Sequence, residues 1–325
     1  MSSSIDLAAR SFKEQLLVLW QNILFFTNSQ FFTPHAPKAT SKRSTIPYYA
    51  PKETWPVPTL PTLDEISQGE HLEDSWSNVC AVKVGEHFVA KFGRRVDFLE
   101  GDNTMFVKKN TNIPVPTIYA MYQADLEVQG EMMNCSVIVM EYIKGKTVRS
   151  SFNDLNDEEK ERFALQLRSH LSELRALPSE GYFGAIGEGP LNVPFHGYYD
   201  NRRTLQGPHR TEEEFVNAMA AAMRHTHYSR DWAEFCIPHI RKAFRGHEPV
   251  FTHAHLSHEN ILIRDEDKSP VLIDWEYSAW LPSFWEHAYL VKGSISDDGW
   301  LPYASKALDA ETETRAWMEM VSRCW

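Results

Sequence analysis

The stretch that most constrains the fold of this chain lies between residues 251 and 280 and reads FTHAHLSHENILIRDEDKSPVLIDWEYSAW. Two short apolar runs, ILI and PVLI, are separated by a polar turn, and runs of this length and composition predict β-strands. A loop with three histidines precedes the first run, and Asp274 closes the second. A carboxylate at the end of an apolar strand is costly unless something binds it. We therefore predict two strands that bring this loop and Asp274 to one site.

The residue types around these strands suit phosphoryl transfer. That reaction needs a cation to neutralise phosphate charge, a lysine on the phosphates and a residue that orients the acceptor hydroxyl. Asn260 and Asp274 offer the hard oxygen ligands that Mg²⁺ prefers. Lys91, in the segment FVAKFG, is expected on a strand, and Glu100 is a helix carboxylate that could hold it. Glu276 is interpreted as a supporting or structural residue.

Residues 79–143 predict a small sheet with one helix. The segment VCAVKVGEHFVAKFG has apolar stretches on either side of Gly85 and Glu86, which is typical of a β-hairpin. A helix-like segment, FLEGDNTMFVKKN, follows and ends before Pro114 and Pro116, which favour an extended backbone. The run CSVIVMEYI is apolar and rich in β-branched residues, so we expect a buried strand.

The remainder of the chain predicts mainly helices. Asn156 and Glu159 have the spacing of a capping box, and Thr211 and Glu214 repeat it. After the first of these boxes, apolar residues recur at helical intervals and predict one buried stripe: Phe163, Leu167, Leu171 and Leu174.

Five segments in this order resemble the aminoglycoside phosphotransferase family, in particular its fungal-type members within the protein-kinase-like superfamily. They are VAKFG, LEGDNTMFVKKNTNIPVPTIYA, VIVMEYIKGKTV, FTHAHLSHENILI and VLIDWEYSAWLPSFWEHAYL, within roughly residues 75–295. The resemblance implies an α+β, protein-kinase-like fold of two lobes, a small β-sheet lobe over residues 62–143 and a mainly helical lobe over residues 144–325. It also implies ATP or GTP and Mg²⁺ as cofactors and a small molecule as substrate.

The same resemblance implies roles for individual residues. Lys91 would contact the nucleotide phosphates, and Glu100 would pair with it. The hinge that meets adenine would be Met140, Glu141 and Tyr142. Asn260 and Asp274 would bind magnesium, and His253 would shape the catalytic loop. Substrate contacts would come from the helical lobe, around residues 192–246.

The chain departs from this family at the centre of the catalytic loop. The family pattern is H-G-D, four further residues and N, whereas this chain has His253, Ala254, His255 and then Asn260 at the same spacing. We interpret the Gly-to-Ala change as mild. His255 takes the place of the catalytic Asp, and a neutral imidazole can accept a hydroxyl proton near pH 7. One hypothesis is therefore a phosphotransferase with His255 as its base, and the alternative is a degenerate relative that binds a ligand or uses His255 in non-phosphoryl chemistry.

A third hypothesis concerns the histidines alone. The segment HAHLSH resembles the H-x-H-x-D-H pattern of the metallo-β-lactamase superfamily, which would make His253, His255 and His258 zinc ligands of a hydrolase. Ser257 stands where that pattern has its aspartate. Because the order of the surrounding segments is kinase-like, this zinc hypothesis ranks last.

Bulk composition narrows the partners and the location. The formal net charge of −11 argues against nucleic acid, because phosphate backbones are bound by clustered Lys and Arg. The four cysteines form no CxxC pair, so a reducing, cytoplasmic location is expected.

Residues 1–61 predict an extension with an apolar segment, residues 16–26, and a Pro- and Ser-rich connector. The apolar segment is too short for the roughly 20 residues of a membrane span. We expect it to pack as a helix on the body or on a partner, with weak interfacial membrane contact as the alternative.

Overall fold

A six-stranded antiparallel sheet forms most of the first half of the structure. The structure is a computed structural model, and it describes residues 44–72, 79–192, 206–224, 229–292 and 299–322. The order of the strands in the sheet is β1-β5-β6-β4-β3-β2. Their bounds are Tyr48–Tyr49 (β1), Glu70–His71 (β2), Val79–Val84 (β3), Phe88–Gly93 (β4), Ile118–Val128 (β5) and Glu131–Glu141 (β6). The expected apolar segment at residues 16–26 lies outside the described residues.

The hairpin of β3 and β4 forms as predicted around Gly85. Gly85 has a φ of +62°, a conformation that glycine adopts without steric cost and that a tight hairpin turn requires. Lys91 pairs with Ala81 of β3 on one side and with Ile138 of β6 on the other. The lysine therefore lies at the centre of the sheet, where its backbone is fixed by strands on both sides.

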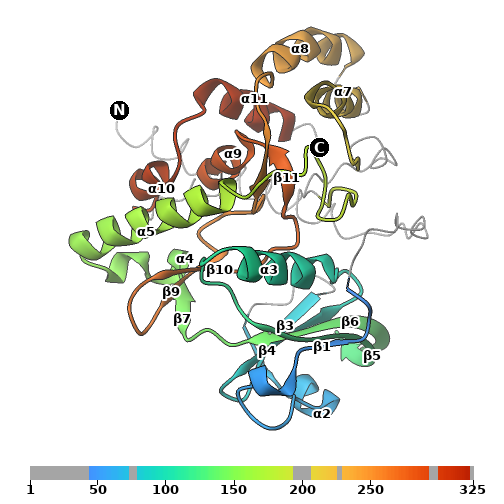
Figure 1. Cartoon of the computed structure of the whole chain (residues 1–325), viewed down its shortest axis with the longest axis vertical. Helices are drawn as coiled ribbons and strands as arrows, with labels where there is room; N and C mark the ends of the chain where they lie inside the picture. The colour runs from blue at the N-terminus through green and yellow to red at the C-terminus, as the bar shows by residue number, and fades with distance from the viewer. Residues whose placement is uncertain (1–43, 73–78, 193–205, 225–228, 293–298, 323–325) are drawn as a thin grey trace, which may run out of the picture. The chain divides into compact units, whose positions relative to one another are not determined.

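Helix α3 (Leu99–Asn110) lies between the sheet and the second half of the molecule (Figure 1). Its first turns are buried although they carry polar residues, among them Glu100 and Asn103. Gly101 allows this close approach, because a Cβ at this position would meet the sulfur of Met121 on β5 and force that side chain to move. The Asn103 amide donates to the carbonyls of Trp275 and Ser278, at 2.8 and 3.1 Å. The helix is thus joined to the loop that carries Asp274.

The second half is mainly helical, as predicted. The Asn156 capping box is present, and the expected apolar stripe of α5 is fully buried. Thr211 also accepts the expected hydrogen bond from the Glu214 backbone. The helices of this half are α4 (Val148–Ser151), α5 (Asp157–Arg175), α7 (Glu212–Met223), α8 (Arg230–Ala243), α9 (Trp285–Lys292), α10 (Leu301–Ala307) and α11 (Thr312–Ser322). Short helices also occur at Lys52–Thr54 (η1), Leu63–Ser67 (α2) and Phe152–Asp154 (η2). Within the described residues, none of the helices has both the length and the apolar character of a membrane span.

The stretch from residue 251 to 280 contributes to two small sheets. One has the order β10-β9-β7, formed by Pro270–Leu272, Ile261–Arg264 and Gly145–Thr147, and the other pairs β11 (Ala279–Pro282) with β8 (Pro249–Thr252). The two predicted strands are β9 and β10, and their antiparallel pairing is confirmed. Two loops therefore join the two sheets, one from β8 to β9 and one from β10 to β11. The Ile273 backbone N–H donates to the Asn260 carbonyl at 3.1 Å, so these loops lie side by side.

Candidate active site

Two carboxylates from different elements meet the side chain of Lys91. Its ammonium nitrogen lies 2.7 Å from Glu100 Oε2 on α3 and 2.7 Å from Asp274 Oδ1 on the loop after β10. The ion pair expected between Lys91 and Glu100 is present, and the contact with Asp274 was not expected. All three side chains are largely shielded from solvent, with exposed fractions of 16%, 4% and 21%. Such burial strengthens their mutual attraction and makes each charge dependent on the others.

The charges of this group follow from burial and from one another. Burial lowers the pKa of Lys91, but the carboxylates of Glu100, Asp274 and Glu276 outweigh it and raise that pKa well above 10.5. Burial raises the pKa of Glu100 to about 7, and Lys91 opposes that rise. For Asp274, Lys91 and His255 overcome the effect of burial and hold the pKa of the carboxyl below its usual range. Asp274 is therefore the firmly ionised carboxylate of the site.

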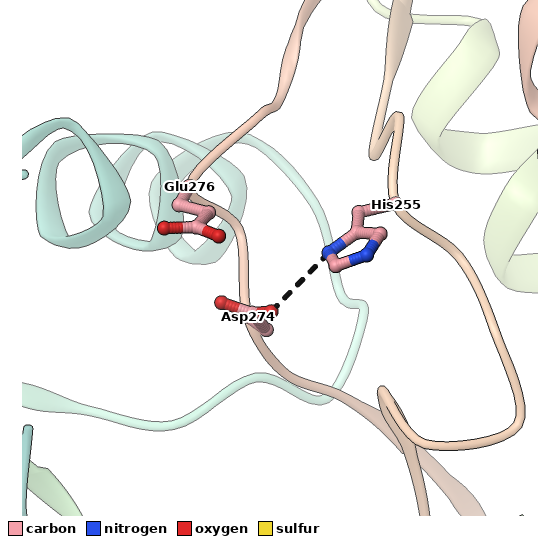
Figure 2. Close-up of side chains that lie close together, drawn as sticks. All are labelled: His255, Asp274 and Glu276. Atoms are coloured by element: carbon pink, nitrogen blue, oxygen red, sulfur yellow. Dashed lines mark ion pairs between the residues drawn. The ribbon is translucent and has the colours of Figure 1, made fainter. Parts of the chain in front are cut away.

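Asp274 reaches its place through an unusual backbone conformation. Its φ is +66°, in the left-handed region that Asp and Asn tolerate better than most residues. The turn presents one carboxylate oxygen to Lys91, and it leaves the other, Oδ2, 3.4 Å from Nδ1 of His255 (Figure 2). The strand end predicted to carry a costly carboxylate thus directs it to a cation and an imidazole.

His253 holds the catalytic loop against the Asp274 loop. Its Nε2 lies 2.8 Å from the Ile273 carbonyl, and its Nδ1 accepts the backbone N–H of His255 at 3.3 Å. Burial lowers the pKa of His253 to about 4, so the ring is neutral near pH 7. Both ring nitrogens are engaged with backbone, which agrees with the loop-shaping role that the resemblance implies, and neither is directed at a substrate.

Ala254 corrects one expectation. The Gly-to-Ala change was expected to be mild, but Ala254 is buried and has a φ of +68°. An L-residue in this region is destabilised by about 1–2 kcal/mol because its Cβ crowds the following carbonyl.

Glu286, at the start of α9, holds this strained turn and was missed by the sequence analysis. Its carboxylate accepts the backbone N–H groups of His253, at 2.6 Å, and Ala254, at 3.3 Å. Burial raises the pKa of Glu286 to about 7, against the opposing effects of these hydrogen bonds and of Arg175. The only signal in the sequence is an acidic residue inside the apolar segment FWEHAYL.

His255 and Asn260 lie in contact on the loop after β8, His255 partly exposed and Asn260 buried. The Asn260 amide nitrogen donates to the His255 carbonyl at 2.8 Å and lies 3.2 Å from Nδ1 of the His255 ring. The ring packs edge-on against Tyr277, with 5.0 Å between ring centroids. Since the amide nitrogen of Asn260 is engaged, its oxygen is the atom suited to a cation. Asp274 Oδ2 lies 3.4 Å from the same Nδ1, so Asn260 and Asp274 both approach one ring nitrogen of His255.

The zinc site proposed for HAHLSH does not form. Among the described residues, the one group of three His, Cys, Asp or Glu side chains with mutually close ligand atoms is His255, Asp274 and Glu276 (Figure 2). His253 is excluded because its ring nitrogens bind backbone.

The expected hinge, Met140 to Tyr142, lies at the end of β6. The backbone N–H of Glu141 donates to the Thr117 carbonyl at 2.9 Å, and that of Tyr142 donates to the His87 carbonyl at 2.8 Å. Lys83 lies over the Tyr142 ring, 4.6 Å from its centroid. With both N–H groups engaged, a backbone donor to adenine would have to come from beyond Tyr142, and the adenine role of this segment stays a prediction.

Comparison with known proteins identifies the fold and a family. A family model described as "Phosphotransferase enzyme family" matches residues 70–320. The solved "GDP complex of wild-type aminoglycoside 2'-phosphotransferase-IIIa" is 14% identical, covers 84% of this chain and 87% of that chain, and has a TM-score of 0.54. The "GDP and kanamycin complex of APH(2")-IIia" is 15% identical, with coverages of 78% and 82% and a TM-score of 0.50. No curated protein matches in sequence. At such low identity the structural likeness shows the fold, and the predicted kinase-like α+β architecture is confirmed.

Proposed function

Because the chain belongs to the phosphotransferase enzyme family, we propose that it transfers a phosphoryl group from ATP or GTP to a hydroxyl group of a small molecule. The observation that carries this proposal is the position of Lys91 between Glu100 and Asp274, beside a loop that presents His255 and Asn260. Each named structural relative was solved with GDP, which supports a nucleotide as the donor.

The donor atoms at the site fit a divalent cation. Asn260 offers an amide oxygen and Asp274 an ionised carboxylate, both hard ligands. When bound, the nucleotide supplies the phosphoryl group and magnesium offsets its negative charge. Lys91 contributes a positive charge for the phosphates, and Glu100 keeps the lysine side chain directed into the site.

His255 presents its ring to the acceptor side of the site. Its Nδ1 faces Asp274 and Asn260, so Nε2, on the opposite edge of the ring, is the nitrogen available to an acceptor hydroxyl. Positioning and electrostatics carry much of phosphoryl transfer, so an imidazole here can support the reaction by orienting the hydroxyl or by taking its proton.

One observation favours the degenerate alternative, a relative that binds nucleotide without turnover. Asp274 Oδ1 contacts Lys91 at 2.7 Å, and this contact has to be exchanged before Asp274 can bind a cation with both oxygens.

The experiment that separates these functions combines binding with turnover. We would measure the thermal unfolding midpoint with Mg²⁺-ATP and with Mg²⁺-GTP, and nucleotide consumption with a panel of hydroxyl-bearing small molecules. The proposal expects a midpoint rise of several degrees, acceptor-dependent consumption, and loss of both in Asp274→Ala. Binding without consumption for any acceptor supports the degenerate alternative, and consumption that survives in Asp274→Ala overturns the proposed site.

A further inference from the structure

His255, Asp274 and Glu276 form a cluster of ligand atoms beside the Lys91–Asp274 contact. Their side chains each offer one ligand atom, all within 4.8 Å of one another, and all three are partly buried (Figure 2). Two loops hold them, because His255 follows β8 whereas Asp274 and Glu276 follow β10. The surroundings are rich in carboxyl groups, since Glu100, Asp274 and Glu276 lie around the single ammonium group of Lys91, and Asp274 is the carboxyl held firmly ionised. The cluster therefore has the ligands for the cation of this site and an ionised carboxylate to attract it.

The atoms that remain available indicate where that cation would lie. Asp274 Oδ1 is taken by Lys91, so Oδ2 is its remaining oxygen, 3.4 Å from Nδ1 of His255. The Asn260 amide nitrogen lies 3.2 Å from the same Nδ1, and an ion bound there would displace this contact. This separation is long for a hydrogen bond, for which N–H···O distances are about 2.7–3.2 Å. It fits two ligands of one metal ion, because bonds of about 2.1 Å to both atoms enclose an angle of roughly 110°.

The chemistry of the ligands selects the kind of ion. Magnesium binds oxygen ligands in near-octahedral geometry, whereas an imidazole nitrogen suits zinc and other first-row transition metals. We infer that His255, Asp274 and Glu276 bind a divalent transition-metal ion, with Zn²⁺ as the best fit, in preference to Mg²⁺, and that His255 is a metal ligand. This inference rests on the proposed active site and deepens it by making the cation at Asp274 a transition-metal ion in place of the magnesium of the proposed function.

The metal role changes what His255 does for the acceptor. With Nδ1 bound to the ion, the ring proton resides on Nε2 in the neutral imidazole. Nε2 then donates a hydrogen bond to the acceptor oxygen and orients it, and the ring does not take the acceptor proton. Replacement of an aspartate by His255 thereby exchanges a carboxylate for a ligand that alters metal preference.

Metal binding without nucleotide tests the inference independently of turnover. The metal-stripped full chain would be titrated with Zn²⁺ against a chromophoric chelator, and with Mg²⁺ in parallel. We expect one Zn²⁺ per chain, bound much more tightly than Mg²⁺. His255→Asp and Glu276→Gln should each weaken Zn²⁺ by at least about tenfold, because loss of even a supporting partner costs 10- to 100-fold. His71→Gln, which removes an exposed histidine of β2, serves as the matched control and should bind Zn²⁺ like the wild type.

Two further measurements guard against misfolding and assign the ligand. Circular dichroism checks that each variant is folded, and His255→Asp is expected to bind Mg²⁺ more tightly than the wild type, which a misfolded chain would not do. With Mn²⁺ as the probe, pulsed electron paramagnetic resonance should detect an imidazole nitrogen coupled to the ion, absent in His255→Asp. Equal Zn²⁺ affinity in the wild type and a folded His255→Asp variant overturns the inference, as does Mn²⁺ without nitrogen coupling. If Zn²⁺ binds as expected but no nucleotide is consumed, the metal site stands and the phosphotransferase proposal fails.

Discussion

Lys91 and Asp274 lie 183 positions apart in the chain, and their side chains meet at 2.7 Å. Lys91 lies at the centre of the six-stranded sheet, and Asp274 lies on a loop between the two small sheets of the second half. Together with the Lys91–Glu100 pair, the contact neutralises part of a site that holds three carboxylates. This single lysine therefore connects the two halves of the fold and is also part of the candidate active site.

Removal of Lys91 should be strongly destabilising. In Lys91→Met the carboxylates of Glu100 and Asp274 lose their shared cation, and breaking a buried ion pair in this way typically costs about 3–5 kcal/mol. We expect a loss of this order in the unfolding free energy from urea titration.

Lys108→Met is the matched control for that substitution. Lys108 is half exposed and its ammonium lies 4.0 Å from Glu141, a geometry that contributes less than about 1 kcal/mol. If the two variants lose similar stability, the Lys91 group does not stabilise the junction between the halves.

The buried Asn103 amide offers a second test of this junction. Asn103→Ala removes the amide donor of the Ser278 carbonyl and leaves the Trp275 carbonyl with the Ser278 backbone N–H, so we expect a loss of about 1–3 kcal/mol in urea unfolding. The control lies on the same helix, because the Asn110 amide donates to the Phe106 carbonyl at 2.8 Å but is exposed. Asn110→Ala should lower the unfolding free energy by less than about 1 kcal/mol. Equal losses in the two variants would show that the hydrogen bonds of Asn103 to the Asp274 loop do not stabilise the junction.

Local signals explain which parts of the fold could be predicted. The hairpin at Gly85, the capping box of α5 and the strands β9 and β10 are encoded by neighbouring residues, and each was found. The pairing of Lys91 with Glu100 was expected from the residue types and from the resemblance, because nothing in the sequence between them fixes their distance.

The features that were missed depend on tertiary contacts. The Glu286 carboxylate accepts a hydrogen bond from the backbone N–H of His253, 33 positions away in the sequence. The Asn103 amide donates to the carbonyl of Trp275, 172 positions away. The proximity of Glu276 to His255 likewise appears only once the two loops lie side by side. The positive φ of Ala254 was hidden for a different reason, since alanine carries no sequence signal for that conformation.

Ala254→Gly should stabilise the protein. Glycine adopts a positive φ without the Cβ strain of alanine. We expect the unfolding free energy to rise by about 1 kcal/mol, after the larger entropy of glycine in the unfolded chain is subtracted. The control is Ala316→Gly, at an exposed position within α11, which should instead lose about 1 kcal/mol. Thermal unfolding of both variants checks the sign, and a lower midpoint for Ala254→Gly would mean that the left-handed turn carries no strain.

Glu286 should make stability fall as the pH rises through the neutral range. Its pKa is about 7 in the folded protein and 4.5 without the fold, so below pH 4.5 the carboxyl is protonated in both states and its contribution is fully present. Between these values the unfolded chain releases the proton first, and the unfolding free energy falls by up to about 3 kcal/mol, reaching its lower level above pH 7.

Glu286→Gln removes this proton and isolates its effect. The glutamine amide can accept only one of the two backbone N–H groups, so we expect the variant to be less stable than the wild type at pH 5 by about 1–3 kcal/mol. As the pH rises to 8 the wild type loses its proton-linked stability and the variant does not, so the difference should shrink or reverse. Urea unfolding at several pH values measures both curves. Parallel curves would mean that Glu286 ionises in the folded protein as it does in the unfolded chain, and that burial at the turn does not hold its proton.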